Sequence, residues 1–264
     1  MILLVDAGNT RLKWAAWRDG RCRDRGAVPV GEAGGQAARW AGLAPRWVGV
    51  SCVAGDDIRA VLEHTLHGLG VPVFWLVSRA AGFGIRNGYA RPEQLGSDRF
   101  ATLIACQRLG LTPCVVAGIG TAVTVDALTG EGEFLGGLIL PGLGLMRAAL
   151  RGGTAGVRTA ADGMAGVTAD FPTATDSGVE TGIRLAVAGA VREMHHRLGA
   201  RLGRPAGVVL TGGDAALLAG DIGISAQVRD DLVLEGLRWV AADLGVPGGG
   251  GDREERDEEV RGQA

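Results

Sequence analysis

Five residues near the start of the chain have the composition of a phosphate-binding turn. Asp6 follows an apolar run, and Gly8-Asn9 comes two residues later. A carboxylate at the end of a buried strand is costly unless it binds something. Because glycine and asparagine accept positive φ, a tight turn there would present backbone N–H groups, together with the hydroxyl of Thr10, to phosphate oxygens. Lys13, the only lysine of the sequence, adds a mobile positive charge. The same residues also fit an ordinary hairpin with polar surface side chains.

A carboxylate and an arginine stand side by side further along the chain, at Asp98 and Arg99. A carboxylate close to a hydroxyl group can accept its proton, and an arginine can hold an anion through two parallel hydrogen bonds. Ser97 or Asp98 also suits the N-terminus of the helix expected to follow. A helix cap paired with its neighbour is therefore the competing interpretation.

Apolar periodicity and turn residues predict the elements that must position these groups. The first half is expected to run β-β-β-α-β-α-β. The predicted elements are a hairpin over residues 2–14, strands at 21–28, 47–51 and 73–77, and helices at 32–41 and 56–68. A further helix from Ser97 to about Leu109 would carry Asp98, and a Gly-rich loop is expected at 82–88.

The second half repeats this organisation. Its predicted strands are 114–119, 123–126, 134–140 and 207–211, and its predicted helices are 142–150, 177–202, 214–219 and 231–244. Gly120-Thr121 between its first two strands resembles the Gly-Asn-Thr turn of the first half. We therefore predict an α/β fold with duplicated domains at 1–112 and 113–246, which hold a nucleotide in the cleft between them. Dense charge after glycine predicts a disordered tail at 247–264.

The composition excludes several classes of partner. The 264 residues are 47% hydrophobic with a net charge of −2, which gives no electrostatic basis for binding nucleic acid or an anionic membrane. No apolar run approaches the ~20 residues that a membrane helix requires. The four cysteines share no metal-ligand spacing, and most lie in apolar segments. We expect a cytoplasmic protein with free thiols and with neither nucleic acid nor membrane as partner.

Four motifs, in order along the chain, resemble those of the type III pantothenate kinases, bacterial enzymes of the acetate and sugar kinase, heat-shock 70 and actin superfamily. They are Asp6-x-Gly8-Asn9-Thr10-x-x-Lys13; Tyr89-x-x-Pro92-x-x-Leu95-Gly96-x-Asp98-Arg99; Gly120-Thr121-Ala122-x-Thr124-x-Asp126 with Gly136-Gly137-x-Ile139-x-Pro141-Gly142; and Thr211-Gly212-Gly213-Asp214. The resemblance covers residues 2–244 and implies ribonuclease H-like (actin-like) domains. It also implies ATP-dependent phosphorylation of pantothenate to 4′-phosphopantothenate, the first step of coenzyme A synthesis.

The resemblance also implies a role for each matching residue. Asp98 is expected to be the general base. ATP is expected at Asp6, Ala7, Gly8, Asn9, Thr10, Arg11, Leu12, Lys13 and Thr121. Pantothenate is expected at Tyr89, Gly96, Ser97, Asp98, Arg99 and Thr175, the last acting across the interface of a homodimer. Asp6 is expected to hold Mg²⁺, directly or through water. Asp126 is a second metal candidate, which also fits a turn residue at a strand end.

Two positions depart from the family pattern. Gly118 stands where many members have an aspartate that contributes to a monovalent cation site, so dependence on potassium or ammonium stays open. Ala174 replaces an asparagine beside Thr175. A catalytically weak nucleotide-binding homologue with a regulatory role is therefore the alternative prediction, and a kinase for another small hydroxy acid is a third.

Overall fold

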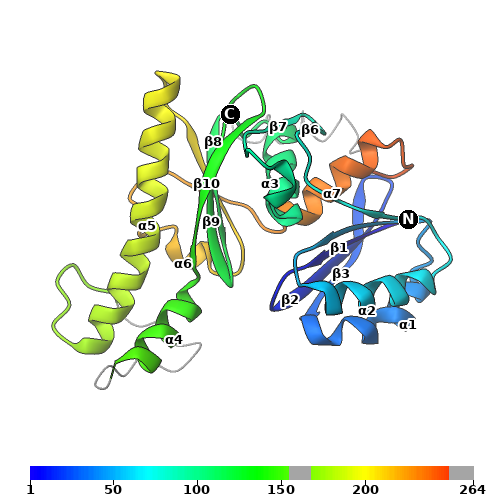
Figure 1. Cartoon of the computed structure of the whole chain (residues 1–264), viewed down its shortest axis with the longest axis horizontal. Helices are drawn as coiled ribbons and strands as arrows, with labels where there is room; N and C mark the ends of the chain where they lie inside the picture. The colour runs from blue at the N-terminus through cyan, green and yellow to red at the C-terminus, as the bar shows by residue number, and fades with distance from the viewer. Residues whose placement is uncertain (155–167, 250–264) are drawn as a thin grey trace. The chain divides into compact units, whose positions relative to one another are not determined.

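A computed structural model describes residues 1–154 and 168–249, which form two compact units (Figure 1). The first unit contains Met1–Ile85, Ala90–Arg108 and the chain from Leu232 onward. The second contains Arg86–Tyr89 and Leu109–Asp231. The part of the predicted tail from residue 250 onward lies outside the described residues.

The sheet of the first unit has the strand order β3-β2-β1-β4-β5. β1 is antiparallel to β2 and parallel to β4. The strands are β1 (Ile2–Ala7), β2 (Arg11–Arg18), β3 (Arg21–Pro29), β4 (Trp47–Cys52) and β5 (Val73–Trp75). The helices are 3₁₀ segments at Val30–Gln36 and Pro92–Gln94, with α1 (Ala37–Gly42), α2 (Asp56–His67), α3 (Ser97–Arg108) and α7 (Leu232–Asp243).

The two faces of this sheet are covered by different helices. Alternate side chains of a strand point to opposite faces. Leu3 and Val5 of β1 therefore join Trp40 of α1 and Leu62 of α2 in one apolar core, and α1 and α2 lie along that face in Figure 1. Asp6 lies on the opposite face, where α7 contacts β1 and β4 and α3 contacts β4.

The sheet of the second unit repeats the same order. β10-β9-β8-β11-β12 corresponds strand for strand to β3-β2-β1-β4-β5, and β7 and β6 follow beyond β10. This repetition confirms the predicted duplicated ribonuclease H-like architecture. The strands are β7 (Ile85–Asn87), β8 (Cys114–Ile119), β9 (Ala122–Leu128), β10 (Glu133–Pro141), β11 (Gly207–Thr211) and β12 (Gln227–Val228). The edge strand β6 (Ala81–Gly82) and Ile85 of β7 are formed by residues of the first unit. The helices are α4 (Leu143–Gly153), α5 (Thr175–Leu202) and α6 (Ala215–Leu218).

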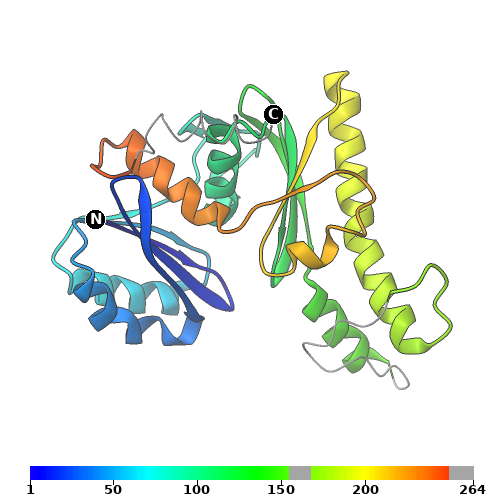
Figure 2. The ribbon, with the colours of Figure 1, turned by 180° about the vertical axis from the view of Figure 1, so that it is seen from behind.

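The core of the second unit lies between its sheet and the long helix α5. Both views of the ribbon place α5 along the β8–β9–β10 sheet, with α6 nearby (Figure 2). Ile183, Val187 and Val191 of α5 pack with alternate residues of β8 and β9, such as Ile119 and Val123. The other face of these two strands therefore carries the intervening residues, which are described with the site below.

The last helix belongs to the first unit, whereas the sequence grouped it with the second domain. A side chain at Gly236 of α7 would collide with the backbone of Ala101 of α3, so the two helices approach as closely as glycine allows. Apolar periodicity predicted the helix itself, but it does not reveal which sheet a helix covers. The Gly-rich loop expected at 82–88 also contains strand β7, whose Arg86 and Asn87 pair with β10.

Candidate active site

The turn between β1 and β2 exposes a short stretch of backbone. The Gly8 amide donates to the Arg11 carbonyl over 3.0 Å, which closes the turn. Asn9 and Thr10 at its tip are exposed. The Thr10 carbonyl accepts a hydrogen bond from the Val30 amide at 2.9 Å, which ties the turn to the end of β3. The tip is thus held from both sides while its polar groups stay accessible.

Three polar side chains form a row across the first sheet beside this turn. Lys13 of β2 is the register partner of Asp6 of β1, and Asp6 is in turn the partner of Ser51 of β4. Directly paired residues share one face of a sheet, with their Cβ atoms about 4.5–5.5 Å apart in an antiparallel pair. Asp6 and Lys13 are half-buried. The row therefore places a carboxylate and an ammonium group side by side at the end of β1.

A buried pair of serines joins this row to the start of α3. The hydroxyls of Ser51 and Ser97 lie 2.9 Å apart, and both residues are buried. The Ser97 hydroxyl also lies 3.5 Å from the Cys52 carbonyl at the end of β4. The N-terminus of α3 is therefore fixed at the same end of the sheet as Asp6.

Asp98 occupies the second position of α3 and is half-buried. Its Oδ1 accepts a hydrogen bond of 2.8 Å from the Arg99 amide, and its carbonyl accepts one of 2.9 Å from the Thr102 hydroxyl. A side chain at Gly96 would collide with Asp98 Oδ1, so glycine there leaves the room that the carboxylate occupies. Burial raises the pKa of Asp98, and the amide and the charge of Arg99 oppose that rise. A raised pKa makes the carboxylate a stronger proton acceptor.

Sequence reasoning missed Ser51 and the reason for Gly96. Ser51 lies at the end of a short apolar strand, and the sequence pattern indicates only that it belongs to a buried run. A buried hydroxyl requires a hydrogen-bond partner, and that requirement was the available signal. Arg99, expected to hold an anion, is only 6% exposed.

The corresponding turn of the second unit lies between β8 and β9. The Gly120 amide donates to the Ala122 carbonyl over 3.1 Å, and Thr121 at the tip is exposed. The Thr121 carbonyl accepts a hydrogen bond of 3.0 Å from the amide of Gly142, just before α4. A side chain at Gly142 would collide with the carbonyls of Gly120 and Thr121. The turn therefore packs directly on the start of α4.

A second glycine segment closes on the same turn. Gly212 has φ +101°, and a side chain there would collide with the backbone of Ile119 at the end of β8. The Asp214 amide lies 3.3 Å from the Ile119 carbonyl. The segments that contain Gly142 and Gly212 thus pack against the Thr121 turn and the strand end before it through backbone atoms.

The remaining predicted residues of this unit lie apart from the turn. Tyr89 donates its amide to Asn87 Oδ1 at 3.0 Å, and its ring lies 5.2 Å from that of Phe134, centroid to centroid. Thr175 is exposed at the first position of α5. Asp126 is only 2% exposed and lies further along β9, which makes it a poorer metal ligand than Asp6.

Gly118 faces Thr124 across the β8–β9 ladder. A Cβ atom at Gly118 would lie 3.0 Å from the Thr124 hydroxyl oxygen, so the position is tightly filled. The end of β8 therefore carries no charged side chain where the end of β1 carries Asp6.

Known proteins agree with this architecture. The sequence profile of the type III pantothenate kinases matches residues 2–197. This chain belongs to the type III pantothenate kinase family. It is 40% identical over 263 residues to the type III pantothenate kinase of Methylibium petroleiphilum, covering 92% of this chain and 99% of that one. It is 42% identical over 247 residues to the same enzyme of Chromobacterium violaceum, covering 91% and 99%. A crystal structure from Campylobacter jejuni, described as a Baf family transcriptional activator, has a TM-score of 0.60 at 17% identity over 92% of this chain and 98% of that one, and shows a shared fold.

The described residues of this type III pantothenate kinase family member were searched for metal-binding clusters and for membrane-spanning helices. Residues 1–154 and 168–249 contain no group of three or more His, Cys, Asp or Glu side chains arranged around a metal. Mg²⁺ bound mainly by phosphate oxygens and one or two carboxylates needs no such group, so the half-buried Asp6 fits that chemistry. Within the same ranges no helix has both the length and the apolar character required to cross a bilayer.

Proposed function

We propose that this chain transfers the terminal phosphoryl group of ATP to the primary hydroxyl of pantothenate, giving 4′-phosphopantothenate for coenzyme A synthesis. The main support, beyond family membership, is the half-buried Asp98 at the start of α3, whose pKa is raised by burial. The Ser51–Ser97 contact ties this helix start to the row of the sheet that carries Asp6 and Lys13.

Asp98 is the general base of this proposal. It accepts the proton of the pantothenate hydroxyl as the oxygen attacks the phosphorus, a role that a positioned carboxylate performs in phosphoryl transfer. Gly96 and Ser97 set the position of Asp98, and Arg99 holds the pantothenate carboxylate. Tyr89 and Thr175 are further pantothenate contacts in this proposal, Thr175 across the homodimer interface.

ATP binding is assigned to two turns in this proposal. Residues 6–13 and Thr121 contact its phosphates through backbone N–H groups, hydroxyls and the Lys13 ammonium group. Asp6 would hold Mg²⁺, which would neutralise charge on the phosphate oxygens. Asp126 stays the second metal candidate, and its 2% exposure makes it the weaker one.

Monovalent cations are not required in this proposal, because Gly118 offers no carboxylate oxygen for such an ion. The reaction rate is expected to stay within about twofold in potassium, ammonium, sodium or tetramethylammonium salts at equal ionic strength, since cation sites need several oxygen ligands. A rate that depends strongly on potassium would contradict it.

A homodimer is supported by an apolar surface on the second unit. Leu145 of α4 and Leu185 of α5 are 50% and 48% exposed. A cavity of about 670 Å³ between these helices is lined almost wholly by apolar residues, among them Met146, Val179 and Ile183. We expect a second copy of the chain to cover this cavity. Light scattering would then give the mass of a dimer in solution.

The four free cysteines support a reducing, cytoplasmic location.

The decisive experiment is a direct assay of the product. Purified protein is incubated with Mg-ATP and pantothenate, and 4′-phosphopantothenate is measured by mass spectrometry. A panel of other small hydroxy acids competes in parallel. Nucleotide binding without product under every cation condition would favour the regulatory alternative, and a preferred competitor would favour a different acceptor.

A further inference from the structure

The start of α5 is poorly held by its own local contacts. Ala174 precedes the helix and makes no side-chain cap, and Thr175 and Asp176 in the first turn are exposed. Among the described residues, the Ala174 carbonyl accepts hydrogen bonds from inside this turn, from the Ser177 hydroxyl at 3.0 Å and the Gly178 amide at 2.9 Å. An uncapped and exposed helix start frays easily. Tertiary contacts further along α5 must therefore set the position of Thr175.

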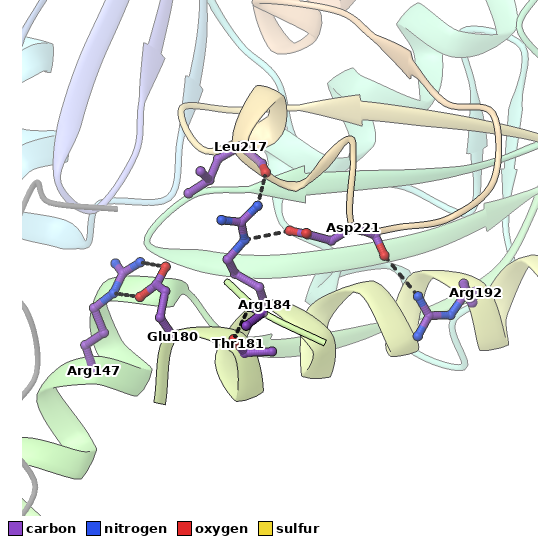
Figure 3. Close-up of polar contacts among 8 residues, drawn as sticks. Arg147, Glu180, Thr181, Arg184, Arg192, Leu217 and Asp221 are labelled. Carbon is purple, nitrogen blue, oxygen red and sulfur yellow. Dashed lines mark hydrogen bonds and ion pairs between the residues drawn. The ribbon is translucent and has the colours of Figure 1, made fainter. Parts of the chain in front are cut away.

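The first buried side chains of α5 provide those contacts. Glu180 accepts two hydrogen bonds from Arg147 of α4, at 2.9 Å from Nε and 2.7 Å from Nη2 (Figure 3). The two side chains are only 4% and 14% exposed. One position later, the Thr181 hydroxyl oxygen lies 3.3 Å from the Ala169 amide of the preceding segment.

The geometry of the pair fixes both distance and rotation. Two parallel bonds between a planar guanidinium and a carboxylate constrain orientation as well as separation. Replacing a buried ion pair by apolar residues is often neutral or stabilising, so stability alone gives no reason for the pair. Its specific contribution is to hold α5 in one rotation against α4.

The other end of α4 reaches the turn of Thr121. The Gly142 amide, one residue before α4, donates to the Thr121 carbonyl, and Gly142 leaves no room for a side chain there. A continuous path of contacts within the second unit thus runs from Thr121 through α4 and the Arg147–Glu180 pair to the start of α5.

We propose that Arg147 and Glu180 are positioning residues for the acceptor substrate, because they fix the start of α5 and with it Thr175. The inference rests on the proposed role of Thr175 in binding pantothenate. The pair touches neither substrate in this proposal and acts only through the placement of α5.

The test is the double variant Arg147→Met/Glu180→Leu, which keeps the contact apolar and well filled. The KM for pantothenate is expected to rise about tenfold or more, because small misplacements of a binding group are costly. The KM for ATP and the melting temperature are expected to stay close to those of the wild type. Since the pair acts through Thr175, adding Thr175→Ala to the double variant should raise the pantothenate KM no further than Thr175→Ala alone.

A second ion pair on the same helix supplies the matched control. Arg184 donates to Asp221 Oδ2 at 2.6 Å and to the Leu217 carbonyl at 2.9 Å, joining α5 to the α6 region (Figure 3). Arg184 lies about 13.5 Å along α5 from Thr175, against about 7.5 Å for Glu180. Arg184→Met/Asp221→Asn should lower the melting temperature and leave the pantothenate KM unchanged.

Three results would overturn the inference: an unchanged pantothenate KM in the Arg147/Glu180 variant, an equal KM change in the control, or full additivity with Thr175→Ala. Each is read against wild-type protein that makes 4′-phosphopantothenate. Absence of product from the wild type is a different outcome, which removes the proposed function and the inference together.

Discussion

The first hairpins of the two units share a topology and differ in chemistry. In the first unit the row beside the turn is Lys13, Asp6 and Ser51, with Asp98 held nearby through Ser97. The topologically equivalent row of the second unit is Thr124, Gly118 and Thr211.

The difference in side-chain chemistry indicates that the two units took on different roles after duplication. The first unit concentrates charged groups at the ends of its strands and at the start of α3. The second unit offers a turn framed by Gly142 and Gly212, whose contacts are made by backbone atoms. The first unit thus gathers charged side chains at this edge of its sheet, whereas the second offers neutral side chains and backbone groups.

The largest effect is expected at Asp98, the proposed general base of the first unit. Asp98→Asn should reduce kcat by about 100-fold or more, the scale of general-base removal, with little change in the KM for ATP. The Asn side chain still accepts the hydrogen bond from the Arg99 amide, so the fold is kept. Steady-state kinetics with both substrates measure kcat and KM. Near-normal turnover would mean that Asp98 has only a structural role at the start of α3.

The close packing of Gly142 against the Thr121 turn is tested by Gly142→Ala. The added methyl group collides with the Thr121 turn, and such overpacking costs about 1–3 kcal/mol of unfolding free energy. Gly144→Ala, two residues later in α4, meets no atom within 4 Å and should instead stabilise by about 0.5–1 kcal/mol. Thermal melts of the two variants should therefore shift in opposite directions. Equal shifts would mean that the turn is not rigidly framed.

The charge difference between the rows is tested by a matched pair of alanine substitutions. Lys13→Ala should raise the KM for ATP about tenfold, because it removes a charged hydrogen-bond donor. Thr124→Ala, at the equivalent position of the other row, should change it less than about twofold, since a neutral hydroxyl contributes less. Similar changes in the KM for ATP from both substitutions would contradict the proposed difference between the two units.

The smallest effect concerns the stability cost of the base. The pKa of Asp98 is raised above 3.8 by burial, so the folded state binds this proton more tightly than the unfolded chain does. The group therefore lowers stability as pH rises from below 3.8 through the folded-state pKa. Asp98→Asn should melt at a higher temperature than the wild type at pH 7.5, and the gap should narrow under acidic conditions. A gap independent of pH would mean that the ionised carboxylate carries no such cost.

Sequence alone predicted what depends on local pattern. The Gly-Asn turn after β1, the strands of both hairpins and α5 follow from apolar periodicity and turn residues. Strand β12 was missed because its two residues are exposed and carry no apolar pattern. The Ser51–Ser97 contact and the Arg147–Glu180 pair join residues 46 and 33 positions apart, and no local rule links such positions.

The close packing of Gly236 against Ala101 has a consequence for the order of synthesis. The first unit takes its last helix from the end of the chain, so its β1–β4 face stays uncovered by α7 until residue 243 has been made. The N-terminal sheet therefore cannot reach its final packing on the ribosome before the second unit has been translated. A fragment that stops at residue 112 would expose the same face permanently.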